Sequence, residues 1–332
     1  MSHALVTGAT GLVGSHIVDR LIADGWRVRA LVREPSSALA AQGVEQVRGD
    51  VLDLESFTRA AAGVDVVFHT AAAVTPKGGW EEYRRPNVDG TSNAIEATAR
   101  AKARLVHLSS VAVYGITGRY REDGRKTDED TPFGALPEKA YYARSKRESE
   151  KLVMDAHSAG KVWATALRPD VIYGTRDRQF TPRIARLLSF GLVPLVGNGR
   201  STFAVVHAAN VADGAVRAAA HDAAGGRAYN LANDFDVTVR QFFTLGAQGM
   251  GKRVHFLSIP RAVAYSVWAT GKFIATAATA GKLSVLSNAS LEIISEDNPF
   301  TSERARRELG WSPPVHPDVG IPEAFRWAWT RR

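Results

Sequence analysis

The feature that most constrains this chain is a glycine-rich turn near its N-terminus, between an apolar run and a helical pattern. The segment reads ALVTGATGLVGSHIVDRLI and carries Gly8, Gly11 and Gly14. Gly8 suits a tight turn, Gly11 lets the backbone approach a pyrophosphate, and Gly14 lets the helix pack closely on the strand. Unpaired amide groups at the start of the helix favour an anion there. The segment therefore predicts a dinucleotide site, and its other predicted contacts are Thr10, Leu12 and Val13.

The first two-thirds of the chain alternates short apolar runs with helical patterns. Runs rich in Val, Leu or Ala are predicted to be strands at Ala4–Thr7, Arg27–Val32, Glu45–Arg48, Val64–Thr70, Leu105–Ser109 and Val162–Leu167. Near-continuous apolar strands separated by helices indicate a parallel sheet covered on both faces. Leu12–Asp24 is one such helix, and Gly25 is placed to end it. The prediction is an α/β, Rossmann-type doubly wound sheet with a ligand crevice at the carboxyl ends of the strands.

After the last of these runs, loops with Gly and Pro interrupt shorter elements. We therefore predict an NAD(P)-binding domain over residues 1–168. Residues 169–332 are predicted to form a smaller, mainly substrate-binding subdomain, with segments returning to the sheet.

Residues 262–286 are apolar but contain Lys272 and Lys282, so a membrane-spanning helix is not expected. A helical lid over a lipophilic substrate is the preferred interpretation. Contact of this segment with a membrane surface is the alternative.

Composition excludes several classes of function. The net charge is +8, but the basic residues are spread along the chain, so nucleic acid is not an expected partner. The chain has no cysteine, which excludes disulfides, thiolate metal sites and cysteine nucleophiles, and no metal site is predicted. The start, MSHALVTG, has no basic region or cleavage site of a secretion signal, so the expected compartment is the cytoplasm. A monomer or homodimer is expected.

The ends of two predicted strands bear on the dinucleotide. The second strand ends in ALVREPS, with Arg33 where a carboxylate is expected for a ribose with a free 2′-hydroxyl. A guanidinium pairs with a 2′-phosphate, so Arg33 favours NADP, with NAD and a merely solvated arginine as alternatives. The fourth strand ends in HTAAAV, whose small side chains let the backbone pass close to the dinucleotide. The predicted contacts there are Thr70, Ala71, Ala72 and Ala73.

Two further motifs carry catalytic residue types. LSSVAVYG ends the fifth strand, and YARSK places Tyr142 and Lys146 four residues apart, on one face of a helix. The ordinary pKa of tyrosine, near ~10, makes it a poor proton shuttle at neutral pH, and an adjacent ammonium is expected to lower that pKa. Tyr141 is five residues from Lys146 and is expected to face elsewhere.

With these motifs in this order, the chain resembles the extended short-chain dehydrogenase/reductase family, of the NAD-dependent epimerase/dehydratase type, over essentially its whole length. The resemblance implies that Tyr142 is the general acid/base and that Lys146 lowers its pKa and binds the nicotinamide ribose. It also implies that Ser110 orients the substrate and that Ser109 lies against the nicotinamide. The remaining cofactor contacts that it implies are Asp50, Val51, Asn87, Pro169, Val171 and Ile172.

Residues further along bear on the substrate. In GNGRSTFAVVH, Phe203 stands where sugar-nucleotide enzymes of the family carry a phosphate-binding arginine, although Arg200 is nearby. This segment, residues 262–286 and the tail TSERARRELGWSP look most like the 3β-hydroxysteroid dehydrogenase branch. That branch implies NADP-dependent interconversion of a secondary alcohol and a ketone on a steroid-like or long-chain β-keto or β-hydroxy substrate. Two alternatives stay open: a sugar-nucleotide epimerase or dehydratase with tightly bound NAD, and a non-catalytic NADP-binding redox sensor.

Overall fold

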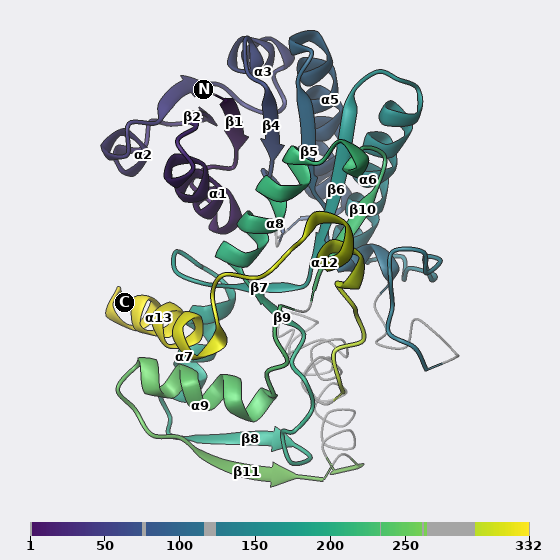
Figure 1. The fold of residues 1–332 in the computed structure, drawn as a ribbon. Coiled ribbons are helices and arrows are strands. Elements are labelled where there is room, and N and C mark those ends of the chain that lie inside the picture. Colours follow the sequence, from purple (N-terminus) through teal and green to yellow (C-terminus); the bar gives the residue numbers. More distant parts are fainter. Residues whose placement is uncertain are drawn as a thin grey trace.

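A seven-stranded parallel sheet forms the centre of the molecule (Figure 1). This computed structural model describes residues 2–74, 78–115, 124–232, 234–260, 262–263 and 296–331. The strand order is β10-β6-β5-β4-β1-β2-β3, so the chain reverses its direction of progress through the sheet between β1 and β4. The strands are β1 (His3–Thr7), β2 (Arg27–Val32), β3 (Glu45–Arg48), β4 (Val66–His69), β5 (Arg104–Leu108), β6 (Trp163–Pro169) and β10 (Ala228–Leu231). The predicted Rossmann-type doubly wound sheet is confirmed.

Helices cover both faces of this sheet (Figure 1). Leu5 and Val6 of β1 are both buried, but they enter different apolar cores on opposite faces. The near-continuous apolar character of the strands follows from this double burial. One core includes residues of α1 (Leu12–Ala23), α8 (Ala208–Ala220) and α12 (Glu303–Leu309). The other includes residues of α3 (Leu54–Ala61), α5 (Gly90–Ala101) and α6 (Tyr141–Ser158).

The chain after β6 builds a smaller layer beyond the carboxyl ends of the strands (Figure 1). Two parallel pairs lie here, β7 (Val171–Tyr173) with β9 (Val205–His207) and β8 (Leu192–Val196) with β11 (His255–Ile259). They pack with α7 (Phe180–Leu188), α9 (Val239–Gly249) and α13 (Pro317–Thr330) around a core rich in aromatic residues. In contrast, β10 and α8 return to the main sheet, where β10 pairs with β6.

Shorter elements connect these layers. They are α2 (Ser37–Ala41), α4 (Trp80–Arg84), the π-helix η1 (Arg85–Asp89) and the 3-10 helices η2 (Val111–Tyr114) and η3 (Asp222–Ala224). The expected lid or membrane contact over residues 262–286 lies outside the described residues, apart from Ala262 and Val263. Within the described ranges, no helix has the length and apolar character that crossing a membrane requires.

Candidate active site

A cavity of about 860 Å³ runs along the carboxyl ends of the central strands. It extends from the glycine turn, past the end of β5 and the start of α6, to β7 and α7. Its wall includes most of the residues predicted to bind the cofactor, namely Gly8, Thr10, Gly11, Leu12, Val13, Gly14, Thr70, Ala72, Ser109, Tyr142, Lys146, Pro169, Val171 and Ile172. The strand order reverses beside this cavity, at the position where open α/β sheets bind their ligands.

The glycine turn has the shape that a pyrophosphate requires. Gly8 has a φ of 68°, and a Cβ atom there would lie 2.9 Å from the Ala71 amide nitrogen. A Cβ atom at Gly14 would overlap the Gly8 carbonyl group. Gly11 is the N-cap of α1 and offers no side chain to the first turn, so the amide groups of that turn are available to an anion. The residues present therefore fit a dinucleotide.

The other predicted cofactor residues lie outside the cavity wall. Arg33 is exposed at the end of β2, and its carbonyl oxygen accepts a hydrogen bond of 3.3 Å from the Arg48 side chain. Asp50 follows β3, and its Oδ1 atom accepts a hydrogen bond of 2.9 Å from the Leu52 amide. Strands β1, β2 and β3 are neighbours in the parallel sheet. Arg33, Asp50 and Val51 therefore lie at the same carboxyl edge of the sheet as the glycine turn.

Asn87 is buried and ties two parts of the site together. Its Oδ1 atom accepts a hydrogen bond of 2.7 Å from the Ala73 amide. Its Nδ2 atom donates to the Ala73 carbonyl and to the Ser145 hydroxyl, each at 2.9 Å. Asn87 thus links the loop after β4, which contains Ala71 and Ala73, to helix α6.

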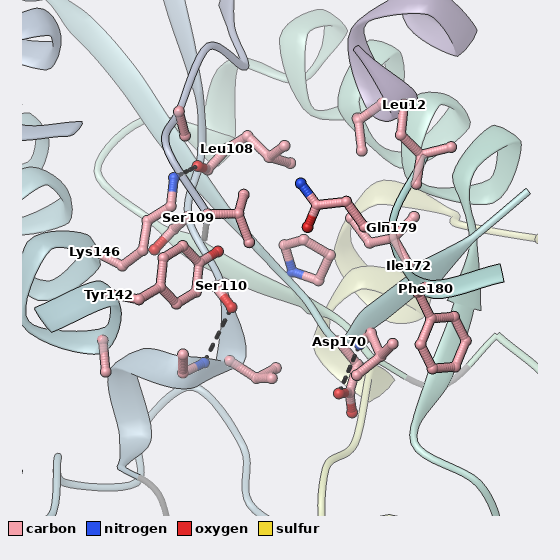
Figure 2. Close-up of a pocket in the computed structure, with 18 of the residues that line it drawn as sticks. Leu12, Leu108, Ser109, Ser110, Tyr142, Lys146, Asp170, Ile172, Gln179 and Phe180 are labelled. Atoms are coloured by element: carbon pink, nitrogen blue, oxygen red, sulfur yellow. Dashed lines mark hydrogen bonds between the residues drawn. The ribbon is translucent and has the colours of Figure 1, made fainter. Parts of the chain in front are cut away.

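The structure brings Ser110, Tyr142 and Lys146 to one side of the cavity (Figure 2). Ser110 follows β5, and its hydroxyl caps η2 by accepting a hydrogen bond of 3.2 Å from the Ala112 amide. Tyr142 and Lys146 project from the first turns of α6. The buried Lys146 ammonium donates a hydrogen bond of 2.8 Å to the Leu108 carbonyl oxygen. The three groups therefore come from a strand end and from one face of a helix, as the sequence spacing predicted.

The surroundings of these groups shift their pKa values in directions that follow from burial. Burial raises the pKa of Tyr142, while a hydrogen bond with the Ser110 side chain opposes the rise. Burial lowers the pKa of Lys146 to about 8, against the opposing charge of Glu150. The pKa of Tyr142 is thus raised where a lowering was expected, because the desolvation of the phenolate is the largest effect.

A buried polar network supports this side of the cavity. The Ser109 hydroxyl donates to Glu150 at 2.5 Å, and Glu150 forms an ion pair with Arg168 at 2.5 Å. Arg168 also donates to the Tyr114 hydroxyl at 2.7 Å, and that hydroxyl donates to Asn230 at 2.8 Å. Ser109 lines the cavity, yet its hydroxyl points into this network. The network joins the ends of β5, β6 and β10 to helix α6.

The opposite side of the cavity is lined by both apolar and charged residues, the latter including Arg176, Asp177 and Arg178. Figure 2 shows Ile172, Gln179 and Phe180 across from Tyr142. Asp170 also lies on this side and was not singled out from the sequence. The signal was a carboxylate inside the apolar segment LRPDVIYG, directly after the predicted contact Pro169.

Two other residues weighed from the sequence differ in whether they reach the cavity. Phe203 is buried in the aromatic core, with its ring centre 5.0 Å from that of Phe242, and does not line the cavity. Tyr141 lines the cavity next to Tyr142, and its ring packs against Trp80 and Tyr83, with ring centres 6.4 and 6.2 Å away. Among the described residues, no group of three or more His, Asp or Glu side chains is placed to hold a metal ion.

Comparison with known proteins identifies the family. A sequence model of the "NAD dependent epimerase/dehydratase family" matches residues 4–232. The chain is 30% identical to 4-hydroxy-2-methyl-3-oxo-4-farnesyl-3,4-dihydroquinoline-1-oxide ketoreductase of Stigmatella aurantiaca, over 97% of this chain and 95% of the relative. It is also 30% identical to 2-alkyl-3-oxoalkanoate reductase of Shewanella oneidensis, over 97% of this chain and 85% of the relative.

A solved structure described as gox2253 matches with a TM-score of 0.78 and 26% identity, over 100% of this chain and 98% of that chain. Sterol-4-alpha-carboxylate 3-dehydrogenases and 3 beta-hydroxysteroid dehydrogenases are also similar to this chain. The resemblance to extended short-chain dehydrogenases, and to their 3β-hydroxysteroid dehydrogenase-like branch, is thereby confirmed. The chain is an NAD(P)-dependent oxidoreductase, and it belongs to the NAD dependent epimerase/dehydratase family.

Proposed function

We propose that this protein interconverts a secondary alcohol and a ketone on a lipophilic substrate, with NADP(H) as the cofactor. The observation that carries the proposal is the position of Ser110, Tyr142 and Lys146. They line one cavity together with the glycine turn and with the apolar side chains of Ile172 and Phe180. The ketoreductase and 3-oxoalkanoate reductase relatives, whose names specify ketone substrates, support the same reaction class.

Each polar group of the site has a role in this reaction. Tyr142 gives a proton to the substrate oxygen during reduction and takes it back during oxidation. Ser110 holds the same oxygen beside the phenol. Lys146 binds the ribose and supplies a positive charge next to the tyrosine. The bound nicotinamide supplies or accepts the hydride.

The cofactor and the substrate would occupy different parts of the chain. Residues 1–168 would hold the dinucleotide, including Asp50, Val51, Ala71, Ala73 and Asn87 at or near the strand ends. Residues 169–332 would mainly hold the substrate. The side chain of Arg33 is exposed at the end of β2, beside Arg48, which forms an ion pair with Glu34 at 3.0 Å. The exposed guanidinium of Arg33 supports a site for the 2′-phosphate of NADP.

The cofactor preference is tested by calorimetric binding of NADPH and NADH to the protein and to an Arg33→Ser variant. We expect NADPH to bind more tightly, and the preference to fall about 10-fold in the variant, because a charge-assisted phosphate contact is lost. Exposed Arg59→Ser, at the end of α3, is the matched control. Equal affinities of the protein for both cofactors would contradict the assignment of NADP.

The reaction is tested by following NADPH oxidation with medium-chain 3-oxo acids, monoketones and 3-oxosteroids. Turnover of at least one class supports the proposal. NAD already bound on purification, with no ketone turnover, would instead support an epimerase or dehydratase. NADPH binding without any turnover would support a redox sensor.

The burial of Phe203, away from the cavity, favours the ketone reaction over sugar-nucleotide chemistry. The cytoplasmic compartment, the monomeric or dimeric state and the membrane-surface alternative remain predictions.

A further inference from the structure

Asp170 is a buried carboxyl group in the cavity wall that the proton-transfer scheme leaves without a role. It follows β6, and only 9% of the residue's surface is exposed. Its Oδ1 atom accepts a hydrogen bond of 2.8 Å from the Val171 amide. Its Oδ2 atom is buried and has no hydrogen-bond partner among the residues that the structure describes. A buried polar atom without a partner destabilises the fold, so a ligand atom that pairs with Oδ2 is favoured.

The protonation state of Asp170 decides which ligand atom it can bind. Burial raises its pKa to about 8, and the hydrogen bond from Val171 opposes the rise. The carboxyl group is therefore mostly protonated at neutral pH. Because Oδ1 already accepts a hydrogen bond, the proton belongs on Oδ2, which becomes a donor. Its natural partner is a carbonyl or carboxylate oxygen.

The position of Asp170 places it near the reacting atoms. Leu108 of β5 pairs with Leu167 of β6, and the extended chain carries Ser110 to a place beside Pro169. Neighbouring strands lie ~4.8 Å apart, and Asp170 is one residue further along. Figure 2 shows its carboxyl group across the cavity from Ser110. When the substrate oxygen binds at Ser110, the next few atoms of the substrate can therefore contact Asp170.

We propose that Asp170 is a specificity-determining residue that donates a hydrogen bond to a second oxygen of the substrate, a carbonyl or carboxylate oxygen close to the reacting ketone, as in a 3-oxo acid. This assignment rests on the proposed function, because it takes the ketone held at Ser110 and Tyr142 as the reacting group. The alkyl part of such a substrate would contact the apolar side chains of Ile172 and Phe180. The site would then select 3-oxo acyl compounds over ketones that lack the second oxygen.

A matched pair of substrates tests this selection. The ketones 3-oxooctanoate and 2-heptanone differ only by the carboxylate group. Asp170→Leu removes the donor at similar volume and is expected to raise KM for 3-oxooctanoate by about 10- to 100-fold, the effect of losing a hydrogen bond to a charged group. Its KM for 2-heptanone should stay unchanged. Asp170→Asn keeps an acceptor for Val171 and places an amide donor at the position of Oδ2, so both KM values should stay within about 3-fold.

Asp170→Ala repeats the comparison without adding volume, in case Asp170→Leu yields little folded protein. Equal losses for both ketones would show a structural role and overturn the assignment. An Asn variant as poor as the Leu variant on 3-oxooctanoate would also overturn it. Both of these results would leave the proposed reaction intact.

Binding measurements distinguish a failure of the role assigned to Asp170 from a failure of the proposed reaction. Calorimetry measures the affinity of 3-hydroxyoctanoate and 2-heptanol for the protein saturated with NADP⁺. If neither ketone is turned over, but Asp170→Leu selectively weakens the binding of 3-hydroxyoctanoate, the assignment of Asp170 holds and the proposed reaction fails. If the protein turns over neither ketone and binds neither alcohol, both are overturned.

Discussion

The two sides of the cavity each hold a buried carboxyl group, and these two groups differ in their partners. Glu150 lies beneath the side that carries Tyr142, forms an ion pair with Arg168 and accepts a hydrogen bond from Ser109. Asp170 lies on the opposite side, where its Oδ1 atom accepts a hydrogen bond and its buried Oδ2 atom has no partner within the part of the chain that the structure describes. A fully paired carboxylate holds a structure in place, whereas an unpaired carboxyl group is available to a ligand. From this comparison we propose that the Tyr142 side carries out catalysis and that the Asp170 side selects the substrate.

The largest effect is expected at the Tyr142 side. Tyr142→Phe removes the hydroxyl that transfers the proton, and should lower kcat by about 10²- to 10⁴-fold. Calorimetric binding of NADPH should be unchanged, because the glycine turn is untouched. Tyr141→Phe is the matched control at the cavity wall. It should keep its rate, because the Tyr141 ring packs against Trp80 and Tyr83 and its hydroxyl has no part in the proposed proton transfer. Full activity of the Tyr142→Phe variant would contradict the role of Tyr142 as the proton donor.

The paired carboxylate is expected to contribute to stability. Glu150→Gln leaves the charge of Arg168 buried without its counter-ion, which should lower the free energy of unfolding by about 3–5 kcal/mol in urea denaturation. Glu148→Gln on the same helix disrupts only an exposed pair with Arg144, and should cost about 0–1 kcal/mol. If the two substitutions lower the free energy of unfolding equally, the ion pair of Glu150 does not stabilise the Tyr142 side of the cavity more than an exposed pair would.

The buried carboxyl group of Asp170 should lower the free energy of unfolding, in contrast to that of Glu150. The size of this effect should depend on pH. The pKa of Asp170 is raised from 3.8 to about 8, so between these values the unfolded chain releases a proton that the folded chain keeps. The free energy of unfolding should therefore fall as pH rises, by about 1.4 kcal/mol per pH unit. Asp170→Asn does not titrate, so its stability relative to the unsubstituted protein should increase between pH 5 and pH 7, by about 3 kcal/mol at most.

Urea denaturation at the two pH values measures this difference. The exposed residue Asp222, which pairs with Arg104 at the surface, provides the control, and Asp222→Asn should show little change with pH. A stability difference for Asp170→Asn that does not depend on pH would mean that Asp170 is ionised at neutral pH. It could then not donate a hydrogen bond to a substrate.

The sequence was sufficient to predict six of the seven strands of the central sheet, and to predict that Ser110, Tyr142 and Lys146 lie together at their carboxyl ends. The strands could be located because each is buried on both faces and is therefore apolar along its length. The glycine turn and the spacing of Tyr142 and Lys146 are local patterns, so their geometry follows from a tight turn and from helical periodicity. The position of Ser110 followed from its place at a strand end.

The features that sequence reasoning missed depend on contacts between distant parts of the chain. Nothing in the short segment AYNL of β10 identifies β6 as its neighbour in the sheet. The burial of Asp170 depends on how the chain folds beyond β6. The direction of the Tyr142 pKa depends mainly on desolvation by the surrounding protein, which outweighs the hydrogen bond with Ser110. Phe203 was noted for the arginine it replaces, but its position is explained by packing against Phe242.

We propose above all that, in this cavity, NADPH transfers a hydride to the carbonyl carbon of a lipophilic ketone. The most direct measurement uses NADPH carrying deuterium at C4 of the nicotinamide, on one face or on the other, with 3-oxo acids and 3-oxosteroids as substrates. Mass spectrometry then locates the label in the product. We predict a single deuterium at the new carbinol carbon, from one of the two labelled cofactors only. Products without the label, or no alcohol product from either cofactor, would contradict the claim.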